Sequence, residues 1–424
     1  MLKERILSIL LTLALLLPAA AAAPAPEEGL RGVWIPSIYN LDYPTRQGMT
    51  EAELKSQANE ILDNVKAMGL NAVFLQVRPA ADALYESDIF PWSRYVSGTQ
   101  GQAPAGGFDP LAYWVDAAHQ RGLQLHAWLN PYRITRGGES DWTSLASDNP
   151  AKLHPEWVVK YEDNYYFNPG LSSVRAMVVD GACEIAENYD VDGIHLDDYF
   201  YPGTDFSDQE TYTRYGKGFD SIDDWRRDNV NQLVADLDKA LHDVDPDLSF
   251  GISPAGIWNN KSADPRGSDT AGRSSYAEIY CDTLAWIEAG TVDYVCPQIY
   301  WEIGFKIADF SKLVDWWTDA VKGSDIDLYV GVGAYRMEDA TAGSVWSGTD
   351  ELTRQLNLIA KDSGVSGEIF YRYNSLTQVA GASDVLSTHY AASPSRPEAQ
   401  TPSPEQQADG LIETFSRFIL ALFH

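Results

Sequence analysis

The chain has 424 residues, of which 45% are hydrophobic, so it can bury a large core. This length is high for one ordinary domain but usual for a barrel with insertions. The formal net charge of −30 makes nucleic acid and other polyanions poor partners, because cationic side chains are needed to neutralise them. A neutral or weakly charged ligand suits this composition better.

The first residues predict an export signal. Lys3 and Arg5 form a charged start, residues 6–17 are an apolar run too short to span a bilayer comfortably, and the alanines at 19–23 offer cleavage sites. We therefore expect residues 1–23 to be a signal peptide. The protein is then secreted and works in the cell envelope, outside the cytoplasm. An uncleaved anchor is the alternative.

Apolar runs that predict β-strands alternate with helical patterns from residue 31 onward. The runs are nearly continuous, as expected for strands that are covered on both faces. They lie at 31–38, 72–77, 123–130, 191–198, 248–254, 292–301, 328–336 and 367–376. Eight such units favour an α/β fold of the (β/α)₈ TIM-barrel type. An open doubly wound sheet is the alternative, but no G-x-G-x-x-G turn follows an early strand.

The expected helices carry clear start and stop signals. Thr50 and Glu53 form a capping box before an apolar face, and Gly69 stands just past the end of that helix. Asp109, followed by Pro110, opens the next helix in the same way. Further helices are expected at 173–188, 222–244, 276–289, 310–321 and 350–363.

The connections between these elements differ in length. The joints from helix to strand are short, whereas those from strand to helix are long, at 78–108, 131–170, 199–220 and 255–275. Barrels build their active sites from loops at the carboxyl ends of the strands. We therefore expect a site at that end of a barrel occupying residues 29–390.

Two further segments follow the expected barrel. Residues 391–408 are rich in Pro, Ser, Gln and Glu, which predicts a flexible linker. Residues 409–424 form an amphipathic tail with contacts expected to the barrel, to a protein partner or to a membrane surface. The membrane is the weaker choice, because Arg417 is the only basic residue of the tail apart from a terminal histidine.

The cysteines and histidines give no sign of a cofactor or a metal site. Three cysteines occur in apolar surroundings, and we expect buried thiols. They are Cys183, Cys281 and Cys296. Zinc-type spacings, a P-loop and a G-x-S-x-G elbow are absent from the sequence, so we expect neither cofactor nor metal.

The segment 190–202 is the most informative one. An apolar strand ends there in two adjacent carboxylates, Asp197 and Asp198. Alternation along the strand places Asp197 inside the barrel mouth with His195, and Asp198 toward a flanking loop. Both are candidate catalytic residues. The alternative is that they cap the following segment or pair with arginines.

The segment 292–302 supplies a second set of polar residues. Gln298, Tyr300 and Glu302 share one face of a strand at period two, and the first two suit sugar hydroxyls. Glu302 follows Trp301, and these apolar surroundings are expected to raise its pKa, as a general acid requires. The alternative is that Glu302 is a solvated loop residue.

Aromatic, amide and guanidinium groups follow several other strands at their carboxyl ends. Together they suit the apolar face and the hydroxyls of a sugar ring. The alternative is ordinary hydrogen bonding at the end of a barrel. The expected substrate-binding residues are Arg78, Asn130, Tyr132, Arg133, His195, Trp258, Gln298, Tyr300, Trp301, Tyr335 and Tyr371.

Motifs spread over residues 31–380 resemble those of the glycosyl hydrolase-like 10 family, also described as domain of unknown function 187. The matching stretches include RGVWIPSIYNLDYP, NAVFLQVRPAADALY, HAWLNPYR, DGIHLDDYFYP, FGISPAGIW, DYVCPQIYW and LYVGVGAYR, in this order. The resemblance implies a TIM-barrel glycosidase. Because the family includes a cell-envelope enzyme, it also implies action on peptidoglycan glycan strands stripped of their peptides.

The fourth strand is also similar to the DGxDxDxE signature of glycoside hydrolase family 18. Asp192 and Asp197 match its first and third acids, but His195 replaces the second and Tyr199 replaces the catalytic glutamate. The sixth strand is similar to the strand that holds the acetamido group in that family. This resemblance implies that the proton donor comes from elsewhere, and Glu302 or Asp198 is expected to supply it.

Taken together, the sequence predicts a glycoside hydrolase that cleaves a polysaccharide of N-acetylated amino sugars. Asp197 is expected to stay ionised and Glu302 to donate the proton. Two alternatives are a non-catalytic carbohydrate-binding barrel and a structural envelope protein that uses the tail for partners. Two carboxyl groups facing each other across the mouth would favour the enzyme.

Overall fold

The computed structural model describes residues 29–338 and 340–392. Their main sheet is built from β1 (Leu30–Ile35), β2 (Ala72–Arg78), β3 (Gln124–Leu129), β6 (Gly193–Leu196), β7 (Ser249–Ile252), β8 (Tyr294–Val295), β9 (Gln298–Ile299), β10 (Asp327–Val332) and β11 (Gly367–Phe370). The strands pair in parallel, in the order β11-β1-β2-β3-β6-β7-β8-β10-β9, and β10 also pairs with β11, which closes the sheet.

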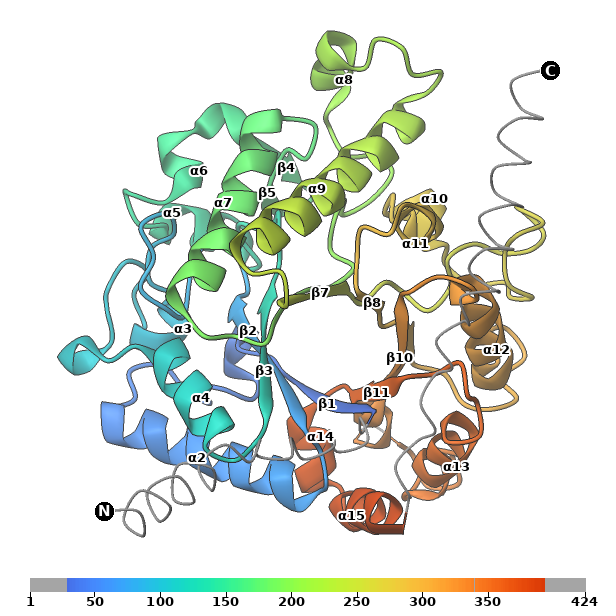
Figure 1. Ribbon diagram of the computed structural model, residues 1–424. Coiled ribbons are helices and arrows are strands. Elements are labelled where there is room, and N and C mark those ends of the chain that lie inside the picture. Colours follow the sequence, from blue (N-terminus) through green and yellow to red (C-terminus); the bar gives the residue numbers. More distant parts are fainter. Residues whose placement is uncertain (1–28, 339, 393–424) are drawn as a thin grey trace, which may run out of the picture. The chain divides into compact units, whose positions relative to one another are not determined.

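The closed sheet has eight strand positions. β8 and β9 are parts of one strand, interrupted at Cys296 and Pro297, and both pair with β10. Helices form a ring around this barrel (Figure 1). The predicted TIM barrel is confirmed, although most of its strands are shorter than the apolar runs that predicted them.

The helices of the outer ring are α2 (Glu51–Ala67), α4 (Pro110–His119), α7 (Ser172–Asn188), α9 (Ile222–Val244), α11 (Thr283–Ala289), α12 (Phe310–Val321), α13 (Asp350–Ile359), α14 (Tyr373–Gln378) and α15 (Ala382–Ala392). The capping box of α2 is present, because the Thr50 side chain accepts from the backbone N–H of Glu53 and the Glu53 carboxylate accepts from that of Thr50. The ends predicted for α9 and α12 agree with the structure.

The long loops at the carboxyl ends of the strands carry small elements of their own. They are η1 (Ile38–Asn40), α3 (Arg94–Ser97), η2 (Ala105–Gly107), α5 (Gly138–Ser144), α6 (Pro150–Leu153), η3 (Pro155–Trp157), the hairpin of β4 (Val158–Tyr161) and β5 (Asn164–Phe167), α8 (Gln209–Tyr215), α10 (Ser275–Glu278) and η4 (Ala334–Met337). The sequence patterns predicted long loops there but not their internal structure.

Two predicted elements differ from the structure. The helix expected at 276–289 is divided into α10 and α11, because Tyr280 adopts a left-handed backbone with φ of 61°. The Tyr280 hydroxyl donates to Asp223 at 2.8 Å and accepts from Arg226 at 2.7 Å. The last predicted strand stops at Phe370 instead of residue 376, and α14 follows it.

The core has two parts. A smaller cluster fills the barrel interior and includes Trp34, Phe74, Trp128 and Tyr294. A larger cluster fills the layer between the strands and the helices. Alternate residues of each strand therefore face the interior or the helices, and this alternation decides which side chains reach the mouth.

The ends of the chain bear on the other predictions. α15 continues to Ala392, two residues into the expected linker. The signal peptide predicted at 1–23, the rest of the linker and the tail predicted at 409–424 lie outside the described residues. No helix in the described ranges is long and apolar enough to cross a membrane.

The three cysteines are unpaired. Cys281 and Cys296 are buried, as predicted, but Cys183 is only partly buried. Cys183 lies on α7, which has one face toward solvent. The prediction of a buried thiol is therefore wrong at this position.

Candidate active site

Asp197 lies at the carboxyl end of β6, inside the barrel mouth, with 3% of its surface exposed. Asn130 donates from its side-chain nitrogen to both Asp197 oxygens, at 2.7 and 2.6 Å. The Trp128 indole and the backbone N–H of Tyr199 donate to the same carboxylate, each at 3.2 Å. The predicted inward orientation of Asp197 is confirmed.

A chain of hydrogen bonds fixes the orientation of the side chains around Asp197. The Gln76 carbonyl accepts from the backbone N–H groups of Ser37 and Ile38, at 3.1 and 3.0 Å. The Gln76 side-chain nitrogen must therefore donate, and it does so to the Asn130 carbonyl at 2.7 Å. Asn130 is thereby left to present its own N–H groups to Asp197. Breaking such a buried pair typically costs about 1–3 kcal/mol.

The surroundings of Asp197 act on its charge in both directions. Burial raises the pKa of Asp197, while the nearby Arg133 guanidinium and the hydrogen bonds from Asn130 and Trp128 lower it. All the hydrogen bonds that the structure gives this carboxyl come from N–H donors, so they are best satisfied by the ionised form. Arg133 is itself held in place, with its guanidinium carbon 4.4 Å from the centre of the Tyr199 ring.

Asp198 lies in different surroundings from its neighbour. It is half-buried, and one oxygen accepts from the Gln298 side-chain nitrogen at 3.1 Å. Gln298 in turn donates to the Ser253 carbonyl at 2.9 Å, which holds its amide in this orientation. Burial, followed by the negative charge of Asp197, raises the pKa of Asp198 to about 7. Two adjacent carboxyls in such different surroundings suit a division into proton donor and charge stabiliser.

Three tyrosines lie beside the aspartates. The ring centre of Tyr300 is 5.6 Å from that of Tyr335 and 6.0 Å from that of Tyr371, which also lies 6.1 Å from the ring of Trp34. The three tyrosines are half-buried. Burial raises the pKa of the Tyr371 hydroxyl, so it remains a hydrogen-bond donor. Such a cluster suits a sugar ring, which has an apolar face and polar edges.

His195 shares the interior face with Asp197 but lies below the surface, with 0% exposed. The Trp34 indole donates to His195 Nε2 at 3.0 Å, so the ring proton lies on Nδ1, which donates to the Tyr294 hydroxyl at 2.9 Å. Ser253 Oγ is 3.1 Å from Nε2. Burial keeps the pKa of His195 well below its usual range. The predicted substrate contact is therefore wrong, and His195 is a neutral part of the floor under the site.

Arg78 does not reach the mouth either. The register between β2 and β3 shifts between Gln76 and Arg78, so Arg78 pairs with Leu129 and faces the helix layer. Its guanidinium carbon lies 4.6 Å from the centre of the Phe90 ring, and burial lowers its pKa to about 10. A sequence pattern with strict alternation cannot anticipate this bulge.

Tyr132 and Trp258 are also fully buried, among the residues that pack between strands and helices. The Trp258 indole donates to Asp282 at 3.3 Å, and its ring stacks on that of Trp316 at 6.2 Å. Both residues follow the ends of their strands, where alternation no longer determines direction. The prediction that they contact substrate is wrong.

The structure separates Glu302 and Trp301 from the aspartates. The strand ends at Ile299, so period two does not continue to Glu302. The Glu302 carboxylate accepts from the Trp346 indole at 3.2 Å, in the loop that precedes α13. Trp301 is half-buried against the core of the helix layer. Of the polar residues expected on this segment, Gln298 donates to Asp198, whereas Glu302 lies in the loop before α13, so the predicted place of Glu302 at the mouth is wrong.

Sequence reasoning overlooked the two tryptophans of the site. Trp128 donates to Asp197, and Trp34 connects His195 to the tyrosine cluster. The signal for Trp128 was present, because it alternates with His126 and Asn130 at the end of β3.

Within residues 29–338 and 340–392, no group of three or more His, Cys, Asp or Glu is placed to hold a metal ion.

Comparison with known proteins gives relatives over nearly the whole chain. Residues 29–347 match the model of the family described as glycosyl hydrolase-like 10. Glycosyl hydrolase YngK of Bacillus subtilis (strain 168) is 43% identical over 390 residues, which cover 90% of this chain and 76% of that protein. Glycosyl hydrolase DigH of Escherichia coli (strain K12) is 37% identical over 386 residues, which cover 85% and 88% of the two chains.

Solved structures show the same fold at low sequence identity. The glycoside hydrolase domain of PgaB (BpsB) from Bordetella bronchiseptica is 14% identical with a TM-score of 0.57, over 85% of this chain and 98% of that one. The family match and the two relatives favour the enzyme over the alternatives of a purely structural or non-catalytic barrel. The chain belongs to the glycosyl hydrolase-like 10 family, and with it to the glycoside hydrolases.

Proposed function

We propose that the protein is an exported enzyme that hydrolyses glycosidic bonds in peptidoglycan glycan strands freed of their peptides. The observation that carries the catalytic part is the adjacent pair Asp197 and Asp198, one surrounded by N–H donors and the other with its pKa raised to about 7. The N-terminal pattern of residues 1–23 supports export.

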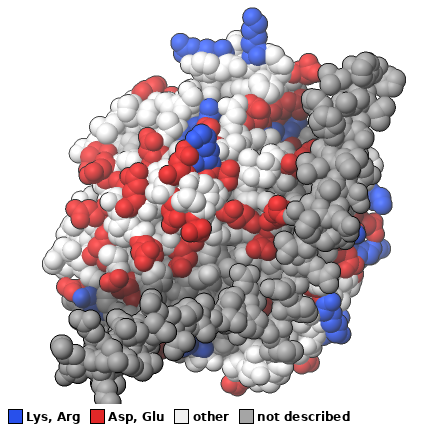
Figure 2. Space-filling model, in the orientation of Figure 1, with Lys and Arg blue, Asp and Glu red and all other residues white. Residues whose placement is uncertain are grey.

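The charge of the surface supports a substrate without strong negative charge. Asp and Glu are spread over the face shown in Figure 2, whereas Lys and Arg are few there. Removal of the peptides takes away their carboxylates and leaves one lactyl carboxylate on every second sugar, so the strands carry less charge than a polymer charged on every unit, which this surface would repel. The N-acetylated sugars that remain present hydroxyl, amide and apolar surfaces, which suit the tyrosine cluster of Tyr300, Tyr335 and Tyr371.

In the proposed reaction, Asp198 is the general acid. It gives its proton to the bridging oxygen as the bond between that oxygen and the anomeric carbon breaks. The ionised Asp197 stabilises the positive charge that develops on the sugar. A water molecule then adds its oxygen to the anomeric carbon, and the proton that it loses restores Asp198. The net change is the addition of one water across the glycosidic bond.

The test is incubation of the purified protein with peptide-free glycan strands while new reducing ends are measured. We expect release of reducing ends by the wild type and not by the Asp198→Asn variant, whose amide cannot donate the required proton. Polygalacturonate, a polyanionic glycan, should not be cleaved. Absence of reducing ends from the glycan strands with folded wild-type protein would overturn the proposed substrate. Cleavage of polygalacturonate would contradict the argument from charge.

A further inference from the structure

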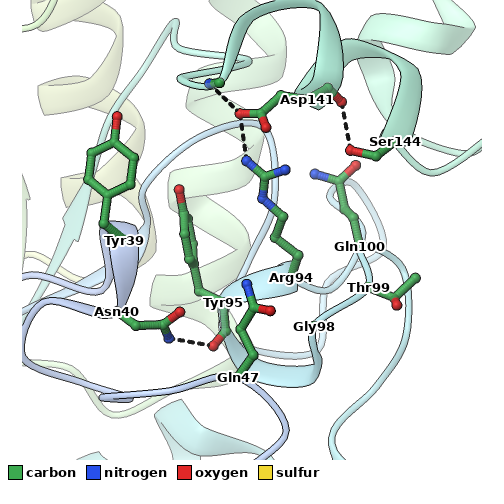
Figure 3. A pocket seen from close by; sticks show the side chains of 11 residues that line it. Tyr39, Asn40, Gln47, Arg94, Tyr95, Gly98, Thr99, Gln100, Asp141 and Ser144 are labelled. Atoms are coloured by element: carbon green, nitrogen blue, oxygen red, sulfur yellow. Dashed lines mark hydrogen bonds and ion pairs between the residues drawn. The ribbon is translucent and has the colours of Figure 1, made fainter.

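A concave pocket lies among the loops at the carboxyl ends of the first three strands. It has a volume of about 480 Å³ and is formed by the loops that follow β1, β2 and β3 (Figure 3). Tyr39 and Tyr95 line it, together with polar side chains that include Gln47, Thr99 and Gln100. Because these loops extend from the carboxyl ends of the strands, the pocket opens on the same end of the barrel as Asp197.

Tyr39 is displayed at this pocket by an unusual backbone. Tyr39 and Asn40 are consecutive non-glycine residues with φ of 58° and 55°. Such conformations cost energy and persist only where the surrounding structure holds them. Here the Asn40 side chain donates to the carbonyls of Pro44 and Tyr95, each at 2.7 Å. The result is a tyrosine ring with 53% of its surface exposed, 6.5 Å from the ring of Tyr95.

Arg136 connects Tyr39 to the catalytic aspartates. Its Nε donates to the Tyr39 hydroxyl at 3.1 Å, and its positive charge also acts on the Tyr199 hydroxyl. Tyr199 is 53% exposed, and its backbone N–H donates to Asp197. Two exposed tyrosine rings, Tyr199 after β6 and Tyr39 at the pocket, therefore lie near the same arginine.

The charged groups on the polar wall of the pocket are paired with each other. Arg94 forms a 2.5 Å ion pair with Asp141, which also accepts from the backbone N–H groups of Arg136 and Gly137 at 3.0 and 2.6 Å. A guanidinium that is already paired has little net charge left to attract an anion. The aromatic surface and the amide and hydroxyl groups of the wall suit a neutral sugar unit instead.

We propose that this pocket binds a sugar unit of the glycan at a distance from the cleaved bond. The proposal rests on the function proposed above and adds that long strands are better substrates than short ones. Binding energy from a remote unit helps to position the reacting bond, so a substrate that cannot reach the pocket loses that gain.

The variant Tyr39→Asn tests this proposal. Asparagine tolerates the left-handed backbone, so the ring is removed while the loop is kept. The matched control is Tyr215→Asn on α8, because Tyr215 is 52% exposed and lies 5.4 Å from the guanidinium carbon of Arg214. A second variant, Thr99→Trp, fills the pocket and leaves Tyr39 unchanged.

The measurement is kcat/KM on peptide-free strands separated by length, compared with the disaccharide unit. We expect Tyr39→Asn to lower the ratio of long to short substrate by roughly three- to tenfold, Thr99→Trp to lower it at least as much, and Tyr215→Asn to leave it unchanged. An unchanged ratio in both pocket variants would overturn the subsite.

A binding experiment separates failure of the subsite from failure of the proposed reaction. The probes are the same length-separated strands, and calorimetry measures their affinity for the Asp198→Asn protein with and without Tyr39→Asn. Tighter binding of longer strands that depends on Tyr39 supports the subsite even where the wild type cleaves none of them. Affinity that does not increase with strand length overturns the subsite even where cleavage occurs.

Discussion

The ends of β6 and β9 offer a comparison within one barrel. Both segments carry polar residues at the spacing of a strand face, and both were expected to deliver a catalytic carboxylate. β6 places Asp197 and Asp198 at the mouth, with hydrogen bonds from Asn130 and Gln298. β9 delivers Gln298 and Tyr300 to the mouth, whereas Glu302 accepts from Trp346 in a loop.

The difference between the two segments is the distance from the last strand residue. Asp197 follows Leu196, the last residue of β6, so the alternation of the strand still sets its direction. Glu302 lies three positions beyond Ile299, the last residue of β9, and its direction is set by the contacts of the loop. The alternation of a strand therefore predicts the direction of a side chain up to about one residue beyond the end of that strand.

The strongest test of the comparison is the loss of each carboxylate. We expect Asp198→Asn and Asp197→Asn each to lower kcat by about 10²-fold or more, the usual scale for a lost acid–base or charge-stabilising group. The measurement is the rate of reducing-end release, with circular dichroism to confirm the fold. Near-normal turnover in both variants would remove the pair at β6 from the mechanism.

The second test uses pH. Since the general acid must be protonated, we expect kcat to fall as pH rises through about 7, the pKa of Asp198. Gln298→Met removes an N–H that favours the ionised carboxylate, so the pKa should rise and the alkaline limb should move upward by up to about one pH unit. The pH at the midpoint of the alkaline fall in kcat can be measured even where the maximal kcat of the variant is lower. A limb that stays in place in Gln298→Met would contradict the assignment of Asp198.

The sequence was sufficient for the fold and for the centre of the site. Capping at Thr50, the alternating units and the inward direction of Asp197 follow from local rules. The placements that failed depend on tertiary contacts, as the bulge before Arg78 and the burial of Trp258 between helices illustrate. The left-handed Tyr39 is set by loop packing, for which the sequence offers no periodic signal.

A third test concerns stability. Asp198 ionises near pH 7 in the fold and near its ordinary value of 3.8 when unfolded. The native state therefore holds a proton that the unfolded state loses, and stability falls as pH rises between these values. We expect Asp198→Asn to raise Tm by roughly 2–5 °C at about pH 8 and to have little effect near pH 4. The exposed Asp220→Asn is the charge-matched control. An equal gain in Tm at about pH 8 and at about pH 4 would contradict the connection between stability and the ionisation of Asp198.

The smallest expected effect is that of Glu302→Gln. The Glu302 side chain accepts from Trp346 and lies apart from the aspartates, so we expect kcat to stay within about threefold of the wild type. Trp346→Phe removes the same hydrogen bond from the other partner and should change kcat as little. The alkaline limb of the pH profile should also stay in place, which distinguishes Glu302 from Gln298. A loss of about 10²-fold together with disappearance of that limb would return the role of proton donor to Glu302 and require the loop before α13 to close over the mouth.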